Sequence, residues 1–190
     1  MKKKINLFDK KISQFPDIIS WAKNLDINDL SNFLMDDKCN KLFLASGGSF
    51  SAAAFAELLS VKRRIMAHSM TPHFYLTSGY DGLPAQTLLI SASGANNDIC
   101  RAYEAGKNNY QQMKAITLSS KGKLQSLMNA SGSENVHSYD IPTGRDGFLS
   151  TNTVLSTFYS IELLDMTIWM ICVQRFQTMN WMKSTNLSQT

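Results

Sequence analysis

Short apolar runs alternate with longer amphipathic segments through the middle of the chain. Five of the runs have the length and composition of strands, and the segments between them carry apolar residues at helical spacing. The expected strands are residues 41–45, 72–77, 86–91, 114–118 and 135–141. The expected helices are residues 49–64, residues 95–108, a short helix with Leu124, Leu127 and Met128, and residues 150–176. This alternation predicts a parallel sheet between two layers of helices.

The N-terminal residues have a helical pattern of their own. Phe15, Ile18, Ile19 and Ala22 keep a spacing of three or four, and Asp26 is placed to cap a second helix that carries Leu30, Phe33 and Leu34. We therefore expect three parts: N-terminal helices over residues 1–36, an αβα domain over residues 37–150, and a C-terminal helix with a polar tail over residues 151–190.

Composition and charge narrow the class of protein. The chain is 44% apolar and 18% charged, which is typical of a globular protein. Its net charge is +4, but the basic residues cluster only between Lys2 and Lys11, so we expect no nucleic-acid binding. Residues 161–173 contain two carboxylates and are too short to span a membrane, and no secretory signal follows the first lysines. We expect a cytoplasmic protein, and the widely spaced cysteines suggest no metal site.

Two segments share one arrangement of strand, serine-rich turn and helix start. Residues 88–98 contain Ser91, Ser93 and Gly94 between an apolar run and a helix, and residues 46–51 (Ser-Gly-Gly-Ser-Phe-Ser) follow the first strand. A helix N-terminus presents unpaired N–H groups and the positive end of the helix dipole, which suits an anion. In a sheet of order 2-1-3-4-5 the two turns leave neighbouring strands, so they are expected to converge on one phosphate.

Three chemistries compete for these turns. A dinucleotide site needs glycine where Ser49 stands. A nucleophile elbow around Ser93 needs glycines at positions 91 and 95, and neither is present. The phosphate monoester of a small polyol suits hydroxyl donors, whereas the alternative without a ligand is that the serines cap two helices. We favour the phosphate monoester and expect no cofactor.

The two turns resemble signatures of the sugar isomerase (SIS) domain family. Residues 91–98, Ser-Ala-Ser-Gly-Ala-Asn-Asn-Asp, are similar to its Ser-x-Ser-Gly-x-[Thr/Asn]-x-[Asp/Glu] signature, and residues 47–52 are similar to its first loop, Gly-x-Ser-x-x-Ala. Residues 115–120 are similar to its fourth strand and the serine turn after it. The resemblance covers about residues 41–140 and implies a flavodoxin-like, three-layer αβα sandwich with a five-stranded parallel sheet.

The resemblance also implies a binding site. It places the phosphate of a sugar on Ser49, Ser91, Ser93 and Asn96, where many members have Thr at the last position. The expected pocket is completed by Gly47, Gly48, Ser51, Gly94 and Arg145. Isomerases of the family need a base to move a proton between adjacent carbons, and no motif assigns one here. The candidate bases are Glu57, His68, Glu104 and Glu162, and each also fits an ordinary surface position.

These observations lead to expectations about function and assembly. We expect a protein that binds a phosphorylated sugar or amino sugar; the alternatives are an aldose–ketose isomerase and a structural subunit with a vestigial pocket. The large apolar residues of the terminal helices, including Trp21, Phe33, Trp169 and Trp181, exceed what one sheet face covers. We therefore expect a homodimer in which the second subunit completes the pocket.

Overall fold

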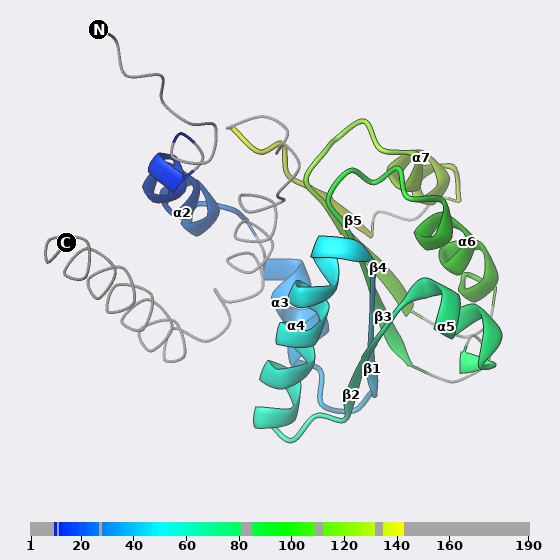
Figure 1. The fold of residues 1–190 in the computed structure, drawn as a ribbon. Helices are drawn as coiled ribbons and strands as arrows, with labels where there is room; N and C mark the ends of the chain where they lie inside the picture. Colours follow the sequence, from blue (N-terminus) through cyan, green and yellow to red (C-terminus); the bar gives the residue numbers. More distant parts are fainter. Residues whose placement is uncertain are drawn as a thin grey trace, which may run out of the picture.

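A five-stranded parallel sheet forms the centre of the protein (Figure 1). The computed structural model describes residues 10, 12–26, 28–80, 85–108, 112–131 and 135–142. The strands are β1 (Lys41–Ala45), β2 (Ala67–Met70), β3 (Gln86–Ser91), β4 (Gln112–Thr117) and β5 (Val136–Ser138). They are ordered β2-β1-β3-β4-β5 and every neighbouring pair is parallel. The predicted sheet and its strand order are confirmed.

Helices cover both faces of this sheet (Figure 1). The helices are α2 (Phe15–Lys23), α3 (Asn28–Met35), α4 (Phe50–Lys62), α5 (Pro72–Thr77), α6 (Asn97–Gly106) and α7 (Lys123–Ala130), with a 3-10 turn η1 (Gly47–Ser49) before α4. One core cluster joins α3 and α4 to the sheet, and the other joins α5, α6 and α7 to it. The three-layer sandwich is thus confirmed. No helix among the described residues is long and apolar enough to cross a membrane.

The central strands β1 and β3 are buried on both faces. Phe43 and Leu88 contribute to the core on the α3–α4 side, whereas Leu44 and Leu89 contribute to the core on the α5–α7 side. A strand that is buried on both faces appears in the sequence as a continuous apolar run rather than an alternating one. This pattern is why β1 and β3 were predicted at their observed positions.

The second strand differs from the prediction. It is Ala67–Met70, and the residues expected to form it are the helix α5. Pro72 lies in the first turn of α5, and the Thr71 Oγ1 accepts a hydrogen bond from the Phe74 backbone N–H at 3.3 Å. Proline at this position and a threonine cap both favour a helix start. β2 was missed because a short edge strand with exposed His68 carries little apolar periodicity.

The N-terminal helices are confirmed, but one of their residues has a different role from the one expected. Asn28 N–H donates to the Asp26 Oδ1 at 3.2 Å before α3 begins. Phe33 was counted as a residue left for a dimer interface; it is only 5% exposed and packs in the core. The expected helix over residues 150–176 lies outside the described residues, as do Arg145, Glu162, Trp169 and Trp181.

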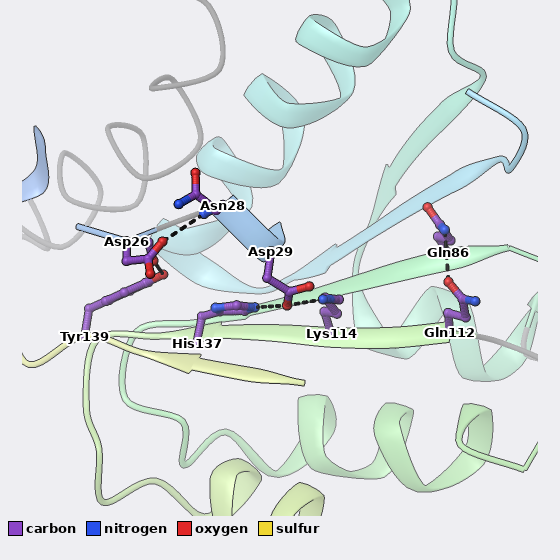
Figure 2. A network of polar contacts seen from close by, with 8 residues as sticks. All are labelled: Asp26, Asn28, Asp29, Gln86, Gln112, Lys114, His137 and Tyr139. Atoms are coloured by element: carbon purple, nitrogen blue, oxygen red, sulfur yellow. Dashed lines mark hydrogen bonds and ion pairs between the residues drawn. The ribbon is translucent and has the colours of Figure 1, made fainter. Parts of the chain in front are cut away.

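Polar contacts attach α3 to the edge of the sheet (Figure 2). The Lys114 ammonium on β4 pairs with the Asp29 carboxylate, and the His137 Nε2 on β5 lies 3.2 Å from the same oxygen. The Tyr139 hydroxyl donates to the Asp26 carbonyl at 2.9 Å. Because β5 has only three residues, these contacts supply much of what holds it in place.

A second polar group lies where β1, β3 and β4 begin. The buried Lys41 ammonium donates to the Phe33 carbonyl at 2.8 Å and also contacts the Gln86 Oε1. Gln86 in turn donates to the Asp36 carboxylate at 2.8 Å and to the Gln112 Oε1 at 3.0 Å. A buried charge is tolerated where its protons are satisfied in this way.

The environment of His137 predicts a loss of stability in mild acid. Burial, followed by the positive charge of Lys114, lowers the pKa of His137 below 6.5, although Asp29 acts in the opposite direction. As pH falls from 6.5 through this lowered pKa, the unfolded chain binds the proton more readily, so the free energy of unfolding falls. Urea unfolding at pH 7.5 and 5.5 tests this. We expect the variant His137→Gln to lose less stability between the two pH values than the parent.

The exposed His68 provides the control. His68→Gln should show the same pH dependence as the parent, because its ring is exposed on β2. If His137→Gln and the parent lose the same stability between the two pH values, His137 does not contribute as described.

Candidate functional site

The two serine-containing turns begin on neighbouring strands. Ala45 at the end of β1 pairs with Ile90 in β3, so the chain leaves both strands at the same edge of the sheet. The turn after β1 leads through η1 into α4, and the turn after β3 leads into α6. Both helices therefore start at this carboxyl edge, with their N–H groups and positive dipole ends toward it. The predicted proximity of the two turns is confirmed.

The first turn leaves its serine hydroxyls uncommitted to capping. Gly47 has a φ of +57°, a conformation that favours glycine. Neither Ser46 nor Ser49 caps the helical turn that follows it. Ser49 is 8% exposed, and among the described residues its hydroxyl has no hydrogen-bond partner. Gly48 and Ser51 are exposed beside it.

The second turn is held from below by backbone hydrogen bonds. The Ala92 carbonyl accepts from the Leu118 N–H at 3.0 Å, and the Gly94 carbonyl accepts from the Leu124 N–H at 2.8 Å. Gly94 has a φ of +61°, and a Cβ built on it would lie 3.0 Å from the Gly122 Cα. Glycine is therefore required at position 94 both for its conformation and for this close approach.

The two serines of this turn differ in their surroundings. Ser91 ends β3 and is 5% exposed, whereas Ser93 is exposed. The Ser93 Oγ accepts a hydrogen bond from the Ala95 N–H at 3.2 Å, so it shapes the turn locally. The Ser91 hydroxyl has no partner among the described residues, and capping explains neither it nor Ser49.

Asn96 has two structural contacts. Its Oδ1 accepts from the Asp98 N–H at 2.9 Å and from the Ile99 N–H at 3.1 Å, which caps α6. Its Nδ2 donates to the Ser46 Oγ in the first turn at 2.9 Å. The capping alternative therefore holds for Asn96. The contact with Ser46 was not predicted, and no local sequence pattern indicates it.

A third turn lies next to the second. The Ser120 N–H and Oγ donate to the two carboxylate oxygens of Asp140, at 2.9 and 2.7 Å. These hydrogen bonds lower the pKa of Asp140. The sequence analysis did not single out Asp140, whose partner lies on a different loop. The pair ties the turn after β4 to the segment after β5.

The candidate bases are not joined to these turns. The Glu57 carboxylate on α4 accepts from the Ser69 N–H on β2 at 2.8 Å and contacts its hydroxyl. His68 and Glu104 are exposed on β2 and α6. Among the described residues, no hydrogen bond links these three side chains to either turn, so the catalytic base stays unassigned. No three His, Cys, Asp or Glu side chains within the described ranges come together as metal ligands.

A cavity of about 710 Å³ lies away from the two turns. Its lining residues come from the ends of α6 and α7 and the start of β4, and include Lys107, Gln112 and Ser131. Two helix C-termini lie beside it, with their negative dipole ends and free carbonyl groups. The carboxyl edge, with two helix N-termini, suits a phosphate better.

Comparison with solved structures decides the fold family. A candidate sugar-phosphate isomerase from Listeria monocytogenes has a TM-score of 0.67 at 13% identity, over 90% of this chain and 89% of its own. The Escherichia coli tagatose-6-phosphate ketose/aldose isomerase has a TM-score of 0.66 at 20% identity, over 85% and 47%. The Vibrio vulnificus NanR protein complexed with ManNAc-6P has a TM-score of 0.67 at 12% identity, over 98% and 71%.

The chain has the SIS fold. The resemblance that the two turns indicate is therefore confirmed at the level of the fold. No protein-family model and no curated protein matches the sequence. The chain spans about nine tenths of the Listeria protein but about half the length of the E. coli isomerase.

Proposed function

We propose that the protein binds a phosphorylated sugar or amino sugar at the carboxyl edge of β1 and β3. The observation that carries this proposal is the pairing of Ala45 with Ile90, because it makes the two turns neighbours. Two helix N-termini then start at one edge, where a dianionic phosphate is stabilised by both dipoles. The buried hydroxyls of Ser49 and Ser91 have no partner among the described residues and supply directed donors.

The remaining predicted residues fit around these two serines. Ser93 is exposed on the second turn, and its hydroxyl proton is available while its oxygen accepts from Ala95. Gly47, Gly48 and Ser51 border the first turn, and Gly94 holds the second in place. Asn96 keeps one amide hydrogen beyond the one that it gives to Ser46. This set binds phosphate without a metal ion.

The ligand class is supported by proteins with the same fold. One is the NanR protein with ManNAc-6P, and another is an E. coli CFT073 protein in complex with a sugar phosphate, with a TM-score of 0.60 at 14% identity. Several neighbours are named as isomerases, which favours isomerisation as the second candidate function. A structural subunit with a vestigial pocket is the third.

A panel of sugar phosphates and amino-sugar phosphates separates these functions. We expect at least one member to raise the melting temperature of the protein, because a ligand that binds only the folded state stabilises it. Each sugar phosphate that does so is then tested for aldose–ketose conversion. Binding without conversion supports a binding protein, and conversion supports the isomerase. No shift with any member contradicts both and favours the vestigial pocket.

Single serine variants test the phosphate contacts. Ser91→Ala and Ser93→Ala should each weaken binding of the best sugar phosphate by about 1–3 kcal/mol, because a charged phosphate oxygen loses a donor. Calorimetric titration measures the change, and urea unfolding should show a much smaller change in stability. Ser78→Ala is the control, because the Ser78 hydroxyl donates to the Phe74 carbonyl at the end of α5. Variants that lose stability but bind as tightly as the parent would leave only a capping role.

We also propose a homodimer in which the second subunit completes the pocket. Ser93 and Ser51 are exposed, so the turns grip a phosphate but leave the sugar open on one side. Leu58 and Val61 lie one helical turn apart on the outer face of α4, at 59% and 54% exposure. Apolar neighbours of this kind favour an interface, and twofold pairing is the commonest assembly.

Light scattering at micromolar concentration tests the assembly. We expect twice the mass of the chain for the parent and a shift toward the monomer for Leu58→Lys, because a charge in an apolar interface is costly. Phe74→Lys is the matched control, since Phe74 is 53% exposed on α5, on the other side of the sheet. A parent that has the mass of one chain contradicts the dimer.

A further inference from the structure

We infer that Asn96 is a positioning residue that holds the two phosphate-binding turns together, and that Ser46 is its partner. The inference rests on the proposed function and assigns a role within that site. Asn96 starts α6 on the β3 side and Ser46 follows β1, so the hydrogen bond between their side chains joins residues 50 positions apart. Among the described residues, it is the side-chain hydrogen bond that crosses from one turn to the other.

The geometry fixes the direction of the Asn96 amide. Two backbone N–H groups, from Asp98 and Ile99, donate to its Oδ1 at 2.9 and 3.1 Å. With the oxygen held by the first turn of α6, the planar amide must direct its Nδ2 away from the helix, and the Ser46 Oγ accepts from it at 2.9 Å. One side chain therefore caps one helix and anchors the turn that leads into another.

Ser46 is well placed to transmit this constraint. It has extended backbone angles, with φ of −136° and ψ of 158°, and it does not cap η1. The next residue, Gly47, turns the chain with a positive φ, and Ser49 follows two residues later. Glycine at two successive positions makes the turn conformationally free, so an anchor at its first residue limits that freedom. A ligand then meets donors that are already arranged.

The chemistry of asparagine explains the dual role. Its acceptor and its donors are on different atoms, so capping through Oδ1 leaves Nδ2 free to bridge. Threonine at the same position offers a single hydroxyl, which is enough to cap α6 but lacks an amide donor. The test therefore uses Asn96→Thr, which preserves a cap and removes the bridge. Ser46→Ala removes the same bridge from its other end and leaves the Asn96 cap intact.

The experiment measures the bridge with and without a ligand. Hydrogen exchange of the ligand-free protein should be faster at residues 46–50 in Asn96→Thr and in Ser46→Ala than in the parent. In calorimetric titration with inorganic phosphate and with ManNAc-6P, each variant should bind about three- to tenfold more weakly, as for loss of one neutral hydrogen bond. The double variant should bind no more weakly than either single one, because both remove the same contact.

A matched control uses the neighbouring asparagine. Asn97 is exposed, and its Oδ1 accepts from the Lys123 ammonium at 3.3 Å. Asn97→Thr makes the same chemical change one residue along the helix, and it should leave both the exchange at residues 46–50 and the phosphate affinity as in the parent. Equal effects of Asn97→Thr and Asn96→Thr would assign the change to α6 as a whole and overturn the inference.

The outcomes distinguish this inference from the proposed function. If Asn96→Thr weakens phosphate binding while Ser46→Ala does not, Asn96 is a direct phosphate ligand and the bridge is wrong. If exchange at residues 46–50 is unchanged in both variants, the bridge does not hold the turn. If the parent binds neither phosphate nor ManNAc-6P while exchange responds as expected, the bridge stands as the link between the turns and the proposed ligand fails.

Discussion

The parallel pairing of β1 with β3 is the constraint on which the candidate site depends. Parallel neighbours end at the same edge, about 4.8 Å apart, so the turns that follow them start side by side. Each turn alone is a helix start with a few hydroxyl groups, a feature that capping alone explains in many proteins. The pairing brings two such starts to one place, and the preference for an anion follows from this topology before any side chain is considered.

Glycine contacts and side-chain contacts then fix each turn in a different way. The turn after β3 lies against Gly122, where a side chain on either glycine would separate the two backbones. The turn after β1 has open space around Gly47, so its backbone is held less closely by its neighbours. The bond from Asn96 to Ser46 joins the less restrained turn to the more restrained one. The rigidity of the site therefore originates on the β3 side.

The sequence predicts the features that depend on local patterns. Continuous apolar runs identify β1 and β3, and serine and glycine after them identify the turns. Local patterns fail where tertiary context decides. Phe74 and Leu76 alternate as in a strand, but Thr71 and Pro72 start a helix there. Phe33 has the spacing of an outward-facing residue as much as of a core residue, and only the position of α3 on the sheet decides between them.

Long-range polar contacts cannot be predicted from spacing, because the partner of a polar side chain depends on strand register and loop conformation. They nevertheless determine where a ligand gains most. Ser120 already donates to Asp140, so an anion that bound its hydroxyl would first have to displace a carboxylate. Ser49 and Ser91 have no such partner among the described residues, so they exchange only water for a phosphate oxygen. The net gain in free energy from phosphate is therefore largest at these two serines, on the two strands whose pairing defines the site.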